Sequence, residues 1–210
     1  MRIQPIVEGH GEVEAIPVLL RRLCKEAGVY NVEIGRPIRY PRCRLVQEAY
    51  LRQAIRLALL QRDCTAILIV LDSDDDCPMK IAPRLEAWVC EEAAGVPCAV
   101  VMARQEYEAW FLASMESLRG IRGIRDDAIS PDAPESIRGA KEHLGTCLRP
   151  GRFYSPAADQ AALTAKFSLA VAYNGCRSFK RMASAFALLV RGMNLGLPQW
   201  PPPSWSSVSP

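Results

Sequence analysis

Short apolar runs alternate along the chain with longer segments whose apolar residues recur every three or four positions. Four of the runs predict β-strands, because glycine, proline or acidic residues bound them and they are too short for helices. The clearest is residues 66–71, which is continuously apolar, as strands covered on both faces of a parallel sheet are. The other predicted strands are residues 2–8, 32–39 and 98–103.

Three segments have the apolar spacing of amphipathic helices: residues 12–27, 46–61 and 81–94. Gly28 and Gly95 follow the first and third of these segments, at positions where helices commonly end. Strands that alternate with helices imply a mostly parallel, four-stranded sheet flanked by helices, which is a Rossmann-like α/β fold.

The second half of the chain has a different pattern. Residues 119–160 contain several glycines and prolines but few large apolar residues, and predict loops with short helices. Two amphipathic helices are predicted at 167–173 and 179–193. Residues 197–210 hold five of the sixteen prolines and four serines, which predicts a disordered tail. We therefore expect an α/β core at 1–118, a loop-rich and helical extension that completes the domain at 119–196, and the tail at 197–210.

The composition, with 50% hydrophobic and 23% charged residues, is that of a soluble globular protein. No apolar run approaches the roughly 20 residues that span a bilayer, and the first residues lack the apolar segment of a signal peptide. The eight cysteines are scattered without a C-x-x-C pair, which favours reduced thiols over a zinc site or a disulfide framework. We expect a cytoplasmic protein that does not bind membranes.

The net charge of +3 conceals a polarised distribution. Residues 1–118 carry 14 basic and 17 acidic side chains, whereas residues 119–210 carry 12 basic and 6 acidic ones. This asymmetry permits a basic surface for a polyanion, although an uneven scatter of solvated charges explains it equally well.

Carboxylates follow three of the predicted strands at the point where each ends. Glu8 ends the first strand, Asp72 and Asp74 end the third, and Glu106 or Glu108 follows the fourth. Ligands of open parallel sheets bind beyond the carboxyl ends of the strands, and alternation along an extended segment puts Asp72 and Asp74 on one side. Converging carboxylates repel one another unless a cation lies between them, and Mg²⁺ prefers carboxylate, water and phosphate oxygens. The pattern predicts a metal-assisted phosphoryl site.

Several familiar enzyme motifs are absent from the sequence. There is no G-x-x-x-x-G-K-[ST], which excludes a P-loop ATPase, and Gly9-His10-Gly11 lacks the third glycine of a dinucleotide fingerprint. There is no G-x-S-x-G either, and the aspartate pair follows the third strand rather than the first strand used by haloacid-dehalogenase-type phosphotransferases. Residues 74–76 can alternatively be a solvated acidic loop, and His10 either contacts phosphate or metal or has no ligand.

Two segments resemble the Toprim domain, the metal-binding module of topoisomerases, primases and overcoming-lysogenisation-defect nucleases. They are IVEGHGE at residues 6–12 and VLDSD at residues 70–74. With EYEAWFLA at 106–113 and CRSFKR at 176–181, the chain is similar to an uncharacterised bacterial Toprim-like family. Members of that family are often encoded beside an AAA or ABC-type ATPase in mobile or defence loci.

The resemblance implies site residues of three kinds. Glu8, Asp72 and Asp74 would bind one Mg²⁺ or Mn²⁺, with Asp76 beside them, and Glu12 and Glu108 would help to hold a second ion. A catalytic lysine is expected from Lys141, Lys166 and Lys180, and of these we favour Lys166 and Lys180. The predicted nucleic-acid-binding residues are Arg177, Lys180 and Arg181, for which a solvated helix face is the equal alternative.

The expected function is that of a Mg²⁺-dependent phosphodiester hydrolase, a nuclease, with DNA favoured over RNA as substrate and an AAA or ABC-type ATPase as a candidate partner. Two alternatives stay open. The first alternative is a non-catalytic regulatory subunit, or a metal- or nucleotide-binding subunit, of such an ATPase system. The second is a metal-dependent phosphatase. The sequence does not indicate an oligomeric state.

Overall fold

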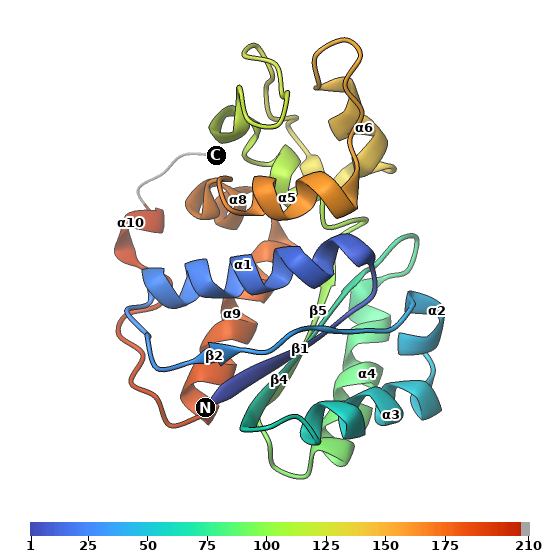
Figure 1. Cartoon of the computed structure of the whole chain (residues 1–210), viewed down its shortest axis with the longest axis vertical. Coiled ribbons are helices and arrows are strands. Elements are labelled where there is room, and N and C mark those ends of the chain that lie inside the picture. The colour runs from blue at the N-terminus through green and yellow to red at the C-terminus, as the bar shows by residue number, and fades with distance from the viewer. Residues whose placement is uncertain (207–210) are drawn as a thin grey trace.

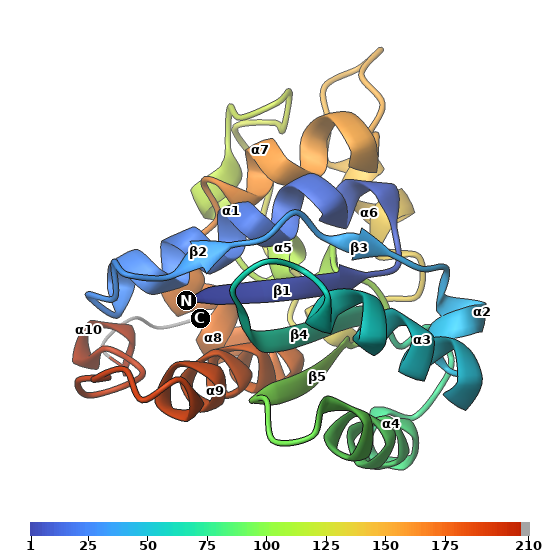
Figure 2. The same ribbon diagram turned by 60° about the horizontal axis from the view of Figure 1, so that its bottom comes forward.

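A parallel five-stranded sheet lies at the centre of the computed structural model, which describes residues 1–206 (Figure 1). The strand order is β2-β1-β4-β5, with β3 also paired to β1, and it can be followed in Figure 2. Every pairing is parallel. The predicted Rossmann-like α/β fold is therefore confirmed. The strands are β1 (Arg2–Val7), β2 (Glu33–Ile34), β3 (Ile38–Arg39), β4 (Cys64–Asp72) and β5 (Cys98–Ala103).

Helices cover both faces of the sheet because β4 is apolar on both sides. Leu68 and Val70 pack in one cluster with α1 and α9, whereas Ile67, Ile69 and Leu71 pack in another with α3 and α4. All five side chains are buried, as the uninterrupted apolar run requires. The helices around the sheet are α1 (His10–Glu26), α2 (Arg42–Leu45), α3 (Glu48–Leu59), α4 (Pro78–Ala93) and α9 (Arg177–Gly192).

The remaining short elements form the upper part of the molecule in Figure 1, above α1 and the carboxyl end of β5. Their position explains why the loop-rich part of the sequence matters for a site at that edge. They are α5 (Ala109–Leu112), the 3₁₀ helices η1 (Met115–Leu118) and η2 (Pro134–Ser136), α6 (Ala140–Thr146), the π-helix η3 (Pro156–Gln160), α7 (Ala161–Thr164) and α8 (Leu169–Gly175), while α10 (Pro203–Ser206) follows α9.

Pro5 divides the strand that the sequence predicts at residues 32–39. Ile3 and Val7 accept backbone hydrogen bonds from Gly35 and Tyr40, so Pro5, between them, faces the same neighbour but has no N–H to donate. The chain opposite Pro5 leaves the ladder at residues 35–37 and separates β2 from β3. The buried amide of Gln4 fills this gap, because its Nε2 donates to the carbonyl oxygens of Pro5 (3.3 Å) and Arg36 (2.7 Å).

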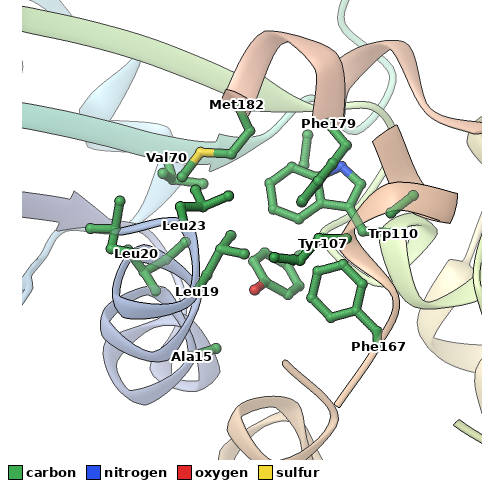
Figure 3. Close-up of a cluster of buried hydrophobic side chains, with 14 of the residues drawn as sticks. Ala15, Leu19, Leu20, Leu23, Val70, Tyr107, Trp110, Phe167, Phe179 and Met182 are labelled. Atoms are coloured by element: carbon green, nitrogen blue, oxygen red, sulfur yellow. The ribbon is translucent and has the colours of Figure 1, made fainter. Parts of the chain in front are cut away.

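Five aromatic rings join the extension to the sheet layer, and four of them, Tyr107, Trp110, Phe167 and Phe179, are labelled in Figure 3. Their ring centroids lie 4.6–5.6 Å apart in tilted or edge-to-face pairs, a favoured arrangement for aromatic side chains. The indole N–H of one ring donates to Ser178 Oγ at 2.8 Å, which satisfies the only polar atom of that side chain. The five rings are Tyr107, Trp110, Phe111, Phe167 and Phe179, and all are fully buried.

Residues 197–206 differ from the disordered tail that the sequence predicts. Trp205 is buried beside Tyr173, and its carbonyl accepts a hydrogen bond from Asn174 Nδ2 at 2.8 Å. The indole N–H of Trp200 donates to the Ala183 carbonyl on α9 at 2.9 Å. The two tryptophans attach this proline-rich segment to the domain, while residues 207–210 lie outside the described part. Among residues 1–206, no helix combines the length and the apolarity that crossing a membrane requires.

Candidate active site at the carboxyl edge of the sheet

Glu8 and Asp72 lie side by side where two neighbouring strands end. The register of β1 and β4 pairs Val7 with Val70, so the acids that follow these positions meet at one edge. The backbone N–H of Asp72 donates to Glu8 Oε2 at 3.0 Å, and Asp72 is only 3% exposed. The predicted meeting of these strand ends is therefore present in the structure.

Lys141, in the first turn of α6, lies among the acids of two strands. Its Nζ is 3.4 Å from Asp72 Oδ2, 3.2 Å from Glu106 Oε1 and 3.9 Å from Glu108 Oε2. Its backbone N–H also donates to Glu106 Oε2 at 2.9 Å, which fixes the start of α6 against the segment after β5. We call Glu8, Asp72, Glu106 and Glu108 together with Lys141 the carboxylate–lysine cluster.

Gln160 connects Glu12 to this cluster. Its Nε2 donates to Glu12 Oε1 at 3.4 Å and to Glu108 Oε1 at 3.3 Å, and Tyr154 donates to the same Glu108 oxygen at 2.8 Å. Gln160 ends the π-helix η3, a rare element that often marks functional sites. A Cβ on Gly11 would overlap the Gln160 amide, so glycine at this position permits the close approach of η3 to α1.

Glu108 has an oxygen without a hydrogen-bond partner. The residue is fully buried, and Oε2 meets only the Lys141 ammonium, at 3.9 Å, among the described residues. Buried side-chain oxygens normally have at least one hydrogen-bond partner, so Oε2 has free capacity for a ligand.

The carboxyl pKa values reflect this crowding. Burial raises the pKa of Glu8 to about 7, with the charges of Glu12 and Asp74 adding to the rise and the Asp72 N–H opposing it. Burial also raises the pKa of Glu108 to about 7, against the lowering effect of Lys141. Burial and the charges of Glu8 and Glu108 raise the pKa of Asp72 well above its ordinary value.

Asp74 and Asp76 face an arginine instead of the cluster. Strand β4 ends at Asp72, and Asp74 has a φ of 47°, so the extended alternation expected to align Asp72 with Asp74 stops before it reaches Asp74. Arg42 Nε lies 3.2 Å from Asp74 Oδ2, and its Nη2 donates to Asp76 Oδ2. The same guanidinium donates to the Asp72 carbonyl at 2.9 Å, so it ties this acidic turn to the end of β4.

The two lysines favoured from the sequence lie elsewhere. Lys166 is exposed, and Lys180 Nζ lies over the Tyr173 ring at 5.6 Å. In the described part of the chain, neither contacts the carboxylate–lysine cluster. Arg177 and Arg181 lie on α9 as predicted, and Arg181 forms an ion pair with Glu86 of α4.

Sequence reasoning named Lys141 as one of three lysines but had no signal to prefer it, because its position depends on the fold of the loop-rich extension. It missed Tyr154 and Gln160 for the same reason. A motif with fixed spacing does not predict that the chain comes back to the sheet edge about 50 residues after Glu108, where Tyr154 and Gln160 lie.

The chemistry of the donors fits a hard divalent cation. No group of three or more His, Cys, Asp or Glu side chains within residues 1–206 has the geometry to hold a metal ion. Mg²⁺, however, is commonly bound through one or two carboxylates, waters and substrate phosphate and not by an all-protein cage. The unpartnered Glu108 oxygen and the adjacent Asp72 carboxylate meet that smaller requirement.

One protein-family model, described as "Domain of unknown function (DUF4276)", matches residues 7–187. No curated protein and no solved structure matches the chain.

Proposed function

The chain belongs to this DUF4276 family, whose description assigns no activity, and from that premise we propose that the carboxylate–lysine cluster is the active site of a Mg²⁺-dependent phosphodiester hydrolase that acts like a Toprim nuclease. The observation that carries the proposal is the convergence of Glu8, Asp72 and Glu108 at one sheet edge with Lys141 between Asp72 and Glu108. Ligands of parallel sheets bind at this edge.

Asp72 and Glu108 are the residues that would hold the ion, with Glu8 hydrogen-bonded to the Asp72 backbone and Glu12 linked to Glu108 through Gln160. When bound, the ion would neutralise the phosphate and make a bound water more acidic. The backbone bond from Asp72 to Glu8 and the bonds of Tyr154 and Gln160 to Glu108 orient these carboxylates before substrate arrives. Such fixed dipoles and charges are the main source of catalysis in phosphoryl transfer.

Lys141 would stabilise negative charge and would not accept a proton. Burial alone would lower its pKa, but the charges of Glu108, Asp72 and Glu106 raise it above its ordinary value. The ammonium therefore stays protonated at neutral pH and suits a role beside the phosphate or the leaving oxygen. Without a metal ion, burial raises the pKa of Glu108 to about 7, so binding a cation there would favour the ionised carboxylate.

The test is cleavage of single- and double-stranded DNA and RNA with Mg²⁺ or Mn²⁺, using wild type, Asp72→Asn and Asp75→Asn. Asp75 is a matched control, because it is an exposed aspartate of the same turn that pairs with Arg138. We expect Asp72→Asn to lose activity by 10³-fold or more and Asp75→Asn to stay within about twofold. Equal activity of the wild type and Asp72→Asn, or cleavage that persists in EDTA, would contradict the proposal.

The same assay separates the remaining alternatives. Hydrolysis of small phosphate monoesters without cleavage of nucleic acid would favour a phosphatase. Cleavage that appears only when an ATPase partner is added would indicate a subunit of a larger system.

A further inference from the structure

A cleft of about 570 Å³ opens next to the carboxylate–lysine cluster, between the β2–β3 segment and the first turns of α1. His10, Arg36 and Arg39 line it, and Arg39 Nη1 lies 3.4 Å from the carbonyl oxygen of Glu8, to which it donates. The cleft therefore adjoins Glu8, the member of the cluster that follows β1.

The wall that carries Arg36 is held in place from inside the protein. Gln4, which is 1% exposed, donates to the Arg36 carbonyl at 2.7 Å, and a Cβ on Gly35 would overlap the Gln4 amide. Pro37, which is buried, restricts the backbone on the other side of Arg36. The segment thus bows outward in a fixed shape with the Arg36 side chain exposed.

The arginines of this cleft are free of ion pairs, unlike three cations near the acidic turn and the cluster. Within residues 1–206, Arg36 and Arg39 are exposed and neither forms an ion pair, whereas Arg42, Arg138 and Lys141 are all paired with carboxylates. Glu14, also exposed, contributes the single negative charge of the lining. Two uncompensated guanidinium groups beside a phosphoryl site suit phosphate oxygens, which arginine can bind through two parallel hydrogen bonds.

We propose that this cleft binds the sugar-phosphate backbone of one nucleic-acid strand, next to the phosphate that is cleaved. This inference rests on the proposed function and names the path of its substrate. The volume lies in the range of small-ligand pockets, which accommodates one or two nucleotides and is too small for a duplex. Arg36 and Arg39 would contact the phosphates, and specificity for the strand over a duplex would follow from the small volume of the cleft.

The experiment measures binding apart from cleavage. Fluorescence anisotropy with a labelled 20-nucleotide single-stranded DNA and the matching duplex is recorded in EDTA, for wild type, Arg36→Ala/Arg39→Ala and Arg21→Ala/Arg62→Ala. The control pair removes the same charge from exposed arginines, because Arg21 lies in the second half of α1 and Arg62 precedes the start of β4. Circular dichroism checks that the double variants fold.

We expect Arg36→Ala/Arg39→Ala to weaken single-strand binding by 10-fold or more and to reduce the salt slope by about 1.4, since each phosphate contact on a single strand contributes about 0.7. The control pair should remain within about threefold of wild type. In Mg²⁺, the same substitution should raise KM more than it lowers kcat.

Three outcomes would overturn the inference. They are equal losses of binding in the two double variants, a loss of binding that is greater for the duplex than for the single strand, and the absence of binding by wild type. The result is separable from the proposed function, because cleavage that depends on Asp72 but not on Arg36 and Arg39 would leave the enzyme assignment intact and remove only the cleft. Binding that depends on the two arginines in a protein that cleaves nothing would support the cleft and contradict the enzyme assignment.

Discussion

The Lys141 ammonium lies 3.4 Å from Asp72 Oδ2, although 69 residues separate the two in the sequence. Asp72 comes from the end of the central strand β4 and Lys141 from a short helix of the extension. The site therefore needs both parts of the domain, and Lys141 is the cation that lies between the carboxylates of β4 and of the segment after β5.

Replacing Lys141 by methionine should remove most of the activity and leave the fold intact. Methionine fills a similar volume but supplies no charge, so Asp72 and Glu108 lose their shared cation. We expect kcat to fall by 10²-fold or more in the cleavage assay. Lys166→Met, which changes an exposed lysine, is the control and should behave as wild type. A Lys141→Met protein with full activity would exclude a catalytic role for this ammonium.

Stability of the metal-free protein should fall as pH rises from about 5 to 8. Glu108 has a pKa of about 7 in the folded protein against an ordinary value of 4.5, so between these values the folded state binds more protons than the unfolded state. Its contribution is complete below 4.5 and is lost as pH rises through 7, by about 3 kcal/mol at most. Urea unfolding of wild type and Glu108→Gln in EDTA measures this. The variant should show a flatter profile, and identical slopes would refute the assignment.

Gly11→Ala should disturb the site through Gln160. The new Cβ would overlap the Gln160 amide and press on Pro156, so η3 must move away from α1. We expect a loss of roughly 1–3 kcal/mol in unfolding free energy, the usual cost of overpacking, and weaker activity. Gly145→Ala is a matched control, because a Cβ there meets nothing within 4 Å. Adding Gln160→Ala should recover part of the loss, and strict additivity of the two changes would argue against contact.

Trp205→Ala should destabilise the protein by about 3 kcal/mol, since it empties a buried aromatic site against Tyr173 and Trp200. Phe153→Ala, at a side chain that is 83% exposed, should change stability by less than about 0.5 kcal/mol. Thermal unfolding compares them. A neutral Trp205→Ala would mean that the segment contributes nothing to the fold, as the sequence alone suggests.

Hydrophobic pattern predicted the sheet well because burial on both faces leaves a direct record in the sequence. Residues 98–103 were expected as a strand and form β5, and residues 66–71 lie within β4. The strand expected at 32–39 is divided because Pro5, in a neighbouring strand, withholds an N–H. That cause lies about 30 residues away and produces no local signal.

The candidate site was predictable only as far as its strand ends. Glu8 and Asp72 follow from the rule that parallel strands present their carboxyl ends at one edge. Asp74 does not lie with Glu8 and Asp72, because its own left-handed backbone conformation turns the chain after β4 ends. Lys141 and Gln160 come from segments without regular periodicity, whose paths are set by packing. The metal, the lysine and the nucleic-acid contacts remain predictions for the experiments above.

The aromatic cluster also bears on the order in which the protein is made. Tyr107 follows β5 and contacts Trp110 and Phe111, but Phe167 and Phe179, which complete the cluster, come 60 and 72 residues later in the sequence. During synthesis the strands and the acids that follow them leave the ribosome before these two phenylalanines have been translated. Glu108, one residue after Tyr107, therefore lies beside a cluster that stays incomplete until Phe179 has been translated. A nascent fragment that ends before Phe179 therefore has the acidic residues but not the complete aromatic cluster beside them, so we expect the proposed activity only after Phe179 has been translated.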